Sequence, residues 1–282
     1  MSASAAVSVR WWGHATATVG LGGVSIVTDP VFTDRLAHLR RVGGPTPAPE
    51  AAEADVAVVS HLHADHLHLP SLRRLPSSAR IVAPRGTAAV LGRDPGLRAR
   101  VEEVDVGDVV TVGAVRIRAV PAHHDGRRLP GSRHRGPALG FVFDDGHRTV
   151  WFAGDTGLFD GLADIGPVDV AVVPVGGWGP TLGPHHLDPE QAAEAVARVG
   201  ARDAVPVHYG TFWPAGLRRV GRSTFQHRFR EPGARFAAAV PGRCPDARVH
   251  VLCQGDQVDL HPGGPPAPTT PQHVADAAPP TR

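Results

Sequence analysis

Short apolar runs separated by turn residues dominate most of this sequence and predict a strand-rich fold. Residues 56–59 are continuously apolar, which is typical of a strand buried on both faces. Near the N-terminus, residues 7–19 and 24–28 predict a hairpin that turns at 20–23. Further strands are expected at 79–83, 109–112, 115–120, 138–143, 149–152, 168–173 and 203–207, with a final hairpin of 248–252 and 257–260 around Gly255.

Helical signals are fewer, and the strongest cover residues 189–199. Asp188 is a favoured N-cap residue, Pro189 suits the first helical position, and Gly200 ends the segment. Shorter helices are expected at 69–75 and 86–91. Strand-rich stretches that are each followed by helices predict a layered α/β domain over residues 1–261. Residues 262–282 are rich in Pro and Ala and predict a disordered tail.

The composition of the 282 residues is that of an ordinary soluble protein, with 42% hydrophobic and 20% charged residues and a net charge of +2. Because no long basic tract occurs, we expect no nucleic-acid partner. Residues 1–10 lack the pattern of a signal peptide, and no apolar run approaches the ~20 residues that span a bilayer. These features favour a cytoplasmic location without a stable membrane anchor.

Metal-type ligands recur in the loops that directly follow predicted strands. They are His61, His63, Asp65 and His66 after strand 56–59, His123 and His124 after 115–120, Asp155 after 149–152, and His208 after 203–207. Rigid strands that end at one sheet edge can position such side chains accurately. The sequence therefore predicts one site built from distant segments.

The run H-x-H-x-D-H at positions 61–66 is the most specific of these signals. Two histidines one residue apart in extended backbone point to the same side and can bind one ion, while Asp65 and His66 turn toward a second. Nitrogen and carboxylate ligands together favour zinc, with manganese, iron and nickel as alternatives. The alternative interpretation is a histidine-rich surface loop that binds nothing, which the preceding strand and the downstream ligands argue against.

Several motifs, in the same order, resemble the metallo-β-lactamase superfamily. The H-x-H-x-D-H run and Ala153-Gly154-Asp155-Thr156-Gly157 are specific for the superfamily. The other pieces resemble its branch of N-acyl-phosphatidylethanolamine phospholipase D-like and ascorbate-6-phosphate lactonase-like proteins: residues 13–16 (GHAT), 28–32 (TDPVF), 121–124 (PAHH), 186–190 (HLDPE) and 208–212 (HYGTF). Together they span roughly residues 9–212.

The resemblance implies a four-layer αββα sandwich in a single domain. It also implies seven ligands for two zinc ions. One ion takes His61, His63 and His124, the other takes Asp65, His66 and His208, and Asp155 bridges both. His123 is the competing choice for the position of His124, although the motif spacing favours His124.

The same resemblance implies a hydrolase in which a metal-bridging hydroxide attacks a phosphodiester, lactone or related ester bond. Two ions about 3.5–4 Å apart lower the pKa of a shared water toward about 7. Asp65, Asp155 and His186 are the expected catalytic residues. His186 either donates a hydrogen bond to a substrate oxygen or leaving group, or is a capping or packing residue before the 189–199 helix. His14 and Asp29 are expected to orient ligands.

The expected substrate is a small molecule, and an anionic group is one hypothesis. Arg127, Arg128, Arg133 and Arg135 lie close in sequence to His124, and guanidinium groups match phosphate or carboxylate oxygens. The alternative is a solvated loop. Trp178, in a Gly-rich loop, either lines the entrance to the site or packs as a plug.

Three alternative functions arise for the same fold. A non-catalytic binding module is disfavoured by the intact ligand motifs. A mononuclear iron oxidoreductase of the same fold is disfavoured, because a one-metal site does not need the complete set of Asp65, His66 and His208. A nucleic-acid-processing hydrolase is disfavoured by the low net charge. The sequence does not specify the substrate or the oligomeric state, because one fold and one metal centre serve many reactions.

Overall fold

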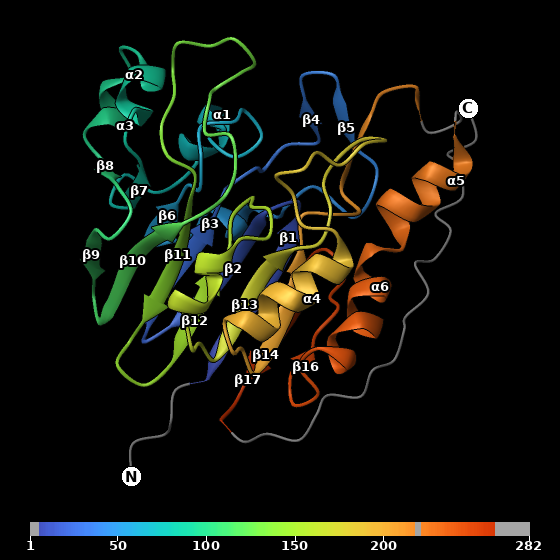
Figure 1. The fold of residues 1–282 in the computed structure, drawn as a ribbon. Helices are drawn as coiled ribbons and strands as arrows, with labels where there is room; N and C mark the ends of the chain where they lie inside the picture. The colour runs from blue at the N-terminus through green and yellow to red at the C-terminus, as the bar shows by residue number, and fades with distance from the viewer. Residues whose placement is uncertain (1–5, 218–220, 263–282) are drawn as a thin grey trace.

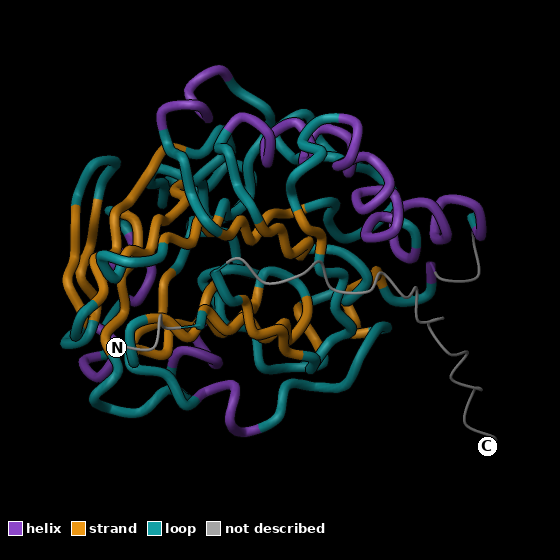
Figure 2. Tube along the Cα trace, turned by 90° about the horizontal axis from the view of Figure 1, so that it is seen from below, coloured by secondary structure: helices purple, strands orange, loops and turns teal. Residues whose placement is uncertain are grey.

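Two seven-stranded sheets lie face to face in the computed structural model, which describes residues 6–217 and 221–262 (Figures 1 and 2). In spatial order, the first sheet contains β17 (Gln257–Leu260), β1 (Val7–Gly13), β2 (Thr16–Leu21), β3 (Val24–Thr28), β6 (Val56–Val58), β7 (Arg80–Pro84) and β8 (Val101–Val104). The second contains β16 (Arg248–Val249), β14 (Asp203–Val207), β13 (Val170–Pro174), β12 (Thr149–Phe152), β11 (Leu139–Asp144), β10 (Val115–Pro121) and β9 (Val109–Val112).

Helices cover the outer face of each sheet, so the predicted α/β fold, a four-layer αββα sandwich, is confirmed (Figure 2). The first sheet is covered by α1 (Leu69–Leu72), α2 (Thr87–Leu91) and α3 (Pro95–Arg98), and the second by α4 (Pro189–Arg198) and α6 (Pro232–Ala239). The remaining helical segments are α5 (Arg222–Phe225), the 3-10 turns η1 (Pro49–Ala52), η2 (Asp160–Asp164) and η5 (Val240–Gly242), and the π-helical turn η4 (Gln226–Arg230).

The main core lies between the sheets, and strand alternation decides which side chains enter it. Trp11 points into this core, whereas its neighbour Trp12 packs on the outer side of the first sheet. In β6, Val56 and Val58 enter the main core and Ala57 faces the helices. The apolar run at 56–59 is therefore buried on both faces, as its pattern predicts.

Two strand predictions were wrong for topological reasons. The predicted strand 7–19 is two strands, because the chain turns at His14, where φ is +52°. The predicted C-terminal hairpin does not form, because β16 pairs with β14 and β17 pairs with β1 in the other sheet. A small third sheet of β4 (Arg35–Leu36), β5 (Leu39–Arg41) and β15 (Phe212–Pro214) was not predicted.

The helix with the strongest sequence signals, predicted at 189–199, forms as α4. The side chain of Asp188 accepts from the backbone N–H of Gln191, and the side chain of Gln191 accepts in return from the backbone N–H of Asp188, which makes a capping box at the start of α4. Within residues 6–217 and 221–262, no helix has both the length and the apolar character needed to cross a membrane. The predicted tail of residues 262–282 lies, apart from Pro262, outside the described residues.

The sheet topology brings the ligand-bearing loops together. β3 and β6 are parallel to each other, as are β12, β13 and β14. β10 runs in the same direction as β12, because both are antiparallel to β11 between them. Within each sheet, the loops that follow these strands therefore emerge at the same edge. The two edges adjoin, because the backbone N–H of His208, after β14, donates to the carbonyl of His14, after β1.

Candidate metal centre

Three histidines make the first group of the site. Nε2 of His61 lies 2.8 Å from Nδ1 of His63, which lies 3.3 Å from Nε2 of His124. Residues 61–66 follow β6 in a series of bends and turns rather than in the extended backbone that was expected. The loop curvature, and not strand alternation, therefore directs His61 and His63 toward the same point.

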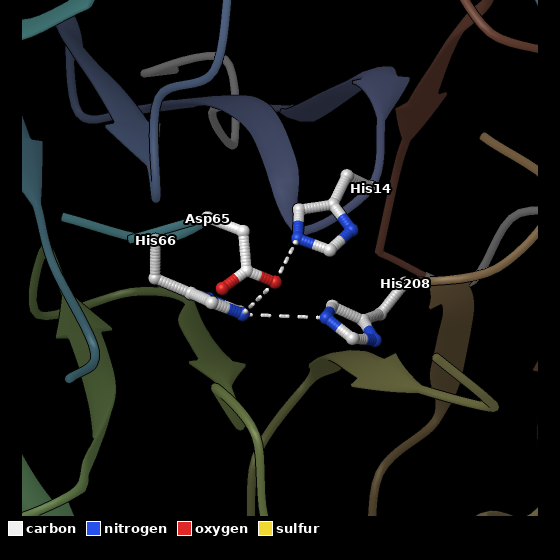
Figure 3. Close-up of side chains that lie close together, drawn as sticks. All are labelled: His14, Asp65, His66 and His208. Atoms are coloured by element: carbon white, nitrogen blue, oxygen red, sulfur yellow. Dashed lines mark hydrogen bonds and ion pairs between the residues drawn. The ribbon is translucent and has the colours of Figure 1, made fainter. Parts of the chain in front are cut away.

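Asp65, His66 and His208 make the second group, and His14 adjoins it (Figure 3). Nε2 of His66 lies 3.3 Å from Nε2 of His208 and 3.7 Å from Oδ2 of Asp65. Oδ2 of Asp65 also lies 3.2 Å from Nε2 of His14. His14 and His208 both adopt a positive φ, and the backbone N–H of His208 donates to the carbonyl of His14 over 2.9 Å.

Asp155 lies beside both groups. Its Oδ2 is 3.3 Å from Nε2 of His66, and its Oδ1 is 3.3 Å from Nε2 of His208. A ligand atom of Asp155 also lies within 4.8 Å of one from His61 and one from His124. The carboxylate is 3% exposed, and among the described residues its Oδ1 has no hydrogen-bond partner. A buried, unpartnered carboxylate oxygen fits a position that faces a cation.

Asp29 and Ser60 orient two of these imidazoles from behind. Nδ1 of His66 lies 2.7 Å from Oδ2 of Asp29, so the ring donates to the carboxylate. Ser60 donates its N–H and its hydroxyl to the same carboxylate, and its Oγ is then free to accept from Nδ1 of His61 over 2.9 Å. These contacts leave Nε2 of both rings with its lone pair toward the site.

Backbone carbonyls do the same for two other histidines. Nδ1 of His208 donates to the carbonyl of Gly176 over 3.1 Å, and Nδ1 of His124 donates to that of His185 over 2.9 Å. An outer hydrogen bond that fixes the tautomer and the ring direction is the usual support of a metal-binding histidine.

The facing lone pairs require a positive charge between them. His66 and His208 have each committed Nδ1 to an oxygen, yet their Nε2 atoms lie only 3.3 Å apart. Two lone pairs at that distance repel each other unless a proton or a metal ion lies between them. The chemistry of the donor set, nitrogens with the carboxylates of Asp65 and Asp155, fits divalent zinc or a neighbouring transition metal.

The charge states agree with this interpretation. Burial lowers the pKa of His208 to about 3 and that of His124 to about 4, and it also lowers the pKa of His61 well below its ordinary value. Burial opposes the charge on Asp155, but His208 and His66 outweigh it and hold the pKa of this carboxyl well below its usual range. Neutral imidazoles and ionised carboxylates are the forms that bind metals.

His66 carries the positive charge of the site in the absence of a metal. Burial disfavours its protonated form, yet Asp155, Asp29 and Asp65 outweigh this and raise the pKa of His66 well above its ordinary value. The imidazolium can then donate to the Asp155 carboxylate. A metal ion that binds His66 must therefore displace this proton.

The structure distinguishes His124 from His123. Nε2 of His124 enters the first group, whereas His123 is exposed and packs against the rings of His185 and Phe159. The spacing argument for His124 therefore agrees with where each side chain lies. Binding of a metal by His124 stays a prediction.

His186 lies at the margin of the site, in reach of Asp155. Its Nε2 is 3.5 Å from Oδ2 of Asp155, and its side chain is 27% exposed. Burial disfavours the charged ring, but the hydrogen bond to Asp155 outweighs it, so the pKa of His186 is raised. Among the described residues its Nδ1 is buried without a partner. The helix is capped by Asp188 instead, so His186 is not the capping residue.

Arg128 has a role that the sequence did not indicate. Its Nη1 donates to the backbone carbonyls of Leu62, His63 and Leu67 over 2.9, 3.3 and 2.8 Å. This guanidinium thus supports the ligand-bearing loop from behind, contrary to the expectation that it reaches toward a substrate anion. Its neighbour Arg127 is exposed and lies 3.7 Å from Asp125.

Other contributors were missed because they carry no motif of their own. Ser60 and Gly176 act through short contacts that only the folded chain creates. Asp29 was named, but its link to His66 could not be read from positions 37 residues apart. Trp178 donates its indole N–H to Oδ2 of Asp65 over 3.0 Å, a contact that its Gly-rich surroundings did not reveal.

Comparison with known proteins settles the family. The family model of the beta-lactamase superfamily domain matches residues 25–209. The chain belongs to the beta-lactamase superfamily. The resemblance deduced from the motifs, including that to the phospholipase D-like branch, is thereby confirmed.

Relatives of the chain include bacterial, animal and archaeal proteins. An N-acyl-phosphatidylethanolamine-hydrolyzing phospholipase D of Caenorhabditis elegans is 32% identical over 72% of this chain, which spans only 63% of that protein. A UPF0173 metal-dependent hydrolase of Methanopyrus kandleri is 31% identical over 73% of this chain and 85% of its own. The structure of Igni18, a metallo hydrolase of Ignicoccus hospitalis, is 24% identical with a TM-score of 0.68, covers 91% of this chain and 99% of its own, and supports the fold.

Proposed function

We propose that this protein is a hydrolase that uses two divalent metal ions, zinc in the first instance, to cleave a phosphodiester, lactone or related ester bond. The observation that carries the proposal is the position of Asp155, whose carboxylate lies within reach of both histidine groups and has an unpartnered buried oxygen among the described residues. Manganese, iron and nickel remain the alternative metals.

The first ion would be held by His61, His63 and His124, and the second by Asp65, His66 and His208, with Asp155 shared. Two such ions, when bound, lower the pKa of a water toward about 7 and polarise the oxygen of the substrate. Such a water would be the nucleophile, so the reaction needs no serine or cysteine. Among the described residues, the only serine or cysteine in contact with the ligand side chains is Ser60, which is buried and donates its hydroxyl to Asp29.

The residues of the chain have separate tasks in this reaction. Asp155 and Asp65 contribute negative charge that keeps two cations in a buried site, and the Nδ1 contacts of the histidines hold the rings in place. His186 lies at the partly exposed margin, and within residues 6–217 and 221–262 its Nδ1 has no hydrogen-bond partner. A protonated His186 at this position can donate to an oxygen of the substrate or of the leaving group.

The relatives support the reaction class. The C. elegans relative is named for hydrolysis of N-acyl-phosphatidylethanolamine, a phosphodiester, and the M. kandleri relative for metal-dependent hydrolysis. We propose a small anionic ester, taken up from solution, as the substrate. We expect no nucleic-acid partner and no stable attachment of the protein to a membrane. The arrangement disfavours a mononuclear iron oxidoreductase, because Asp65, His66 and His208 form a second group that a one-metal site does not need.

The test is a substrate screen of zinc-reconstituted protein against phosphodiesters, lactones, acyl amides and N-acyl phospholipids. We expect two zinc ions per chain and turnover of one ester class. In Asp155→Ala we expect the pair of ions and the turnover to be lost. A single iron ion per chain in the protein as purified, before reconstitution, or turnover that survives Asp155→Ala, would falsify the proposal. Turnover of N-acyl phospholipids alone would reject the small soluble substrate.

A further inference from the structure

The loop between β13 and α4 contacts the candidate site in two places. This loop contains Gly176-Gly177-Trp178-Gly179, and two of these residues form hydrogen bonds with the second ligand group. The carbonyl of Gly176 accepts from Nδ1 of His208 over 3.1 Å. Two residues later, the indole N–H of Trp178 donates to Oδ2 of Asp65 over 3.0 Å. One short segment therefore contacts two of the three proposed ligands of the second ion.

Trp178 differs from the other tryptophans of the chain. Its exposed fraction is 36%, whereas Trp11, Trp12, Trp151 and Trp213 are all exposed by 5% or less. Those four are core residues. Within the described part of the chain, only Trp11 and Trp12 of these four donate the indole N–H to a partner, in each case one near in sequence. A core-packing role therefore does not account for Trp178.

The contact with Asp65 is directional. An indole N–H can only donate, so it requires a lone pair of the carboxylate and fixes the rotation of that group. Oδ2 of Asp65 also faces Nε2 of His14 over 3.2 Å and Nε2 of His66 over 3.7 Å. Trp178 therefore adds to this oxygen a third polar neighbour, a donor from the partly exposed loop between β13 and α4.

The indole is held from its other side by a second element. The ring of His38, in the turn between β4 and β5, meets the ring of Trp178 edge-on, with centroids 5.3 Å apart and an interplanar angle of 75°. The loop also lies against His208, because a Cβ built on Gly177 would be in van der Waals contact, 3.8 Å from Cε1 of His208.

We propose that residues 176–178 form a clamp that positions Asp65 and His208, with Trp178 as the positioning residue that acts on the second metal ion through Asp65. The inference rests on the proposed function, because it concerns ligands of that site. The consequence is selective. Loss of the indole N–H should weaken binding of the ion at Asp65, His66 and His208, and should leave binding of the ion at His61, His63 and His124 unchanged.

The test compares Trp178→Phe, which keeps an aromatic ring but has no N–H donor, with the wild-type chain. Leu217→Ala is the matched control, because Leu217 is another exposed apolar residue, with an exposed fraction of 41%. Zinc dissociation constants are measured by competition with a chromophoric chelator, and the ligand field is measured from the absorption bands of cobalt-substituted protein. Thermal unfolding of the metal-free chains establishes that each variant is folded.

We expect two zinc ions in every chain. In Trp178→Phe one dissociation constant should rise about ten- to a hundredfold, as is typical when a supporting residue of a metal ligand is lost. One set of cobalt bands should shift, and the control should match the wild type. A Trp178→Phe chain that binds both ions with wild-type constants overturns the clamp.

The two proposals fail in different ways. A wild-type chain that binds no pair of ions would reject the proposed function, whereas equal constants in both chains would reject only the clamp. If Trp178→Phe does not fold, zinc titration of the wild-type chain followed by tryptophan fluorescence replaces it. Emission from the exposed indole should then change with one of the two equivalents of zinc, and a spectrum unaltered by either equivalent contradicts the clamp.

Discussion

Oδ2 of Asp29 accepts a hydrogen bond from Nδ1 of His66 over 2.7 Å, and both side chains are completely buried. The same carboxylate accepts from the N–H and the hydroxyl of Ser60, so all its bonds are to residues at the end of β6. Asp29 itself has a φ of +35°, an uncommon conformation for a residue other than glycine. This network fixes where the Nε2 atom of His66 points.

Replacement of Asp29 by asparagine should weaken binding of one metal ion. The amide keeps the shape of the side chain but removes the charge that makes His66 a stronger ligand. We expect affinity for that ion to fall about ten- to a hundredfold, as measured by chelator competition. Asp164→Asn, at an exposed aspartate, is the control. Equal affinities in Asp29→Asn and the control would show that the network does not act on the metal.

His123 and His124 offer a matched pair of substitutions. His124→Ala removes a proposed ligand, so we expect loss of one zinc ion and of most activity, an effect larger than that of a lost supporting residue. His123→Ala removes an exposed ring outside both groups and should retain both ions. Metal content by mass spectrometry decides the matter. Loss of a zinc ion in His123→Ala but not in His124→Ala would assign the ligand to His123.

Arg128 and Arg127 form a second pair of neighbours with different surroundings. In Arg128→Ala three carbonyls of the 61–67 loop lose a charged donor, and we expect the free energy of unfolding to fall by about 2 kcal/mol. Arg127→Ala changes an exposed side chain and should stay within about 0.5 kcal/mol of the wild type. Urea denaturation measures both.

Because Arg128 supports the loop that carries His61 and His63, Arg128→Ala should also bind metal less tightly. Addition of guanidinium at low millimolar concentration should partly restore this affinity, because the free cation can occupy the vacated position. Arg127→Ala should show no such response. If guanidinium leaves the affinity of Arg128→Ala unchanged, the side chain does not support the loop through its charged donors.

An ion pair away from the metal site should make stability depend on pH. The buried carboxylate of Asp203 accepts from Arg248 at both oxygens, over 2.8 and 2.7 Å, and from His250 over 2.7 Å. Burial raises the pKa of Asp203, but the hydrogen bonds from His250 and Arg248 outweigh it, so the pKa is lowered. The resulting stabilisation is complete above the unfolded-state pKa of about 3.9. It is lost as pH falls through the lower folded-state pKa.

Asp203→Asn isolates this contribution. At pH 7 we expect the variant to be less stable by about 3 kcal/mol, since the buried guanidinium contact of Arg248 loses its counter-charge. The difference between the two chains should shrink below pH 4, where the wild-type carboxyl also becomes protonated. Urea denaturation from pH 3 to pH 7 under matched metal conditions gives this difference. A difference that is constant over the whole range would mean that the charge of Asp203 does not contribute.

Local patterns predicted most elements, because they depend on neighbours in sequence. The alternation and the apolar runs located β9, β12, β14 and β17 with correct bounds, and the cap at Asp188 located the start of α4. Pairing is not a local property, so the strands at 248–249 and 257–260 were wrongly joined in a hairpin although they lie in different sheets.

The sequence by itself determined which chemistry this protein can carry, because ligand types and their positions after strands are written in the order of residues. His61, His66, Asp155 and His208 could be named from that order alone. Only the tertiary structure decided which atoms meet. The direction of an imidazole depends on the oxygen behind its second nitrogen, and for His66 and His208 that oxygen belongs to a segment more than 30 residues away. Hydrogen-bond geometry between distant loops is set by packing, which no local pattern encodes.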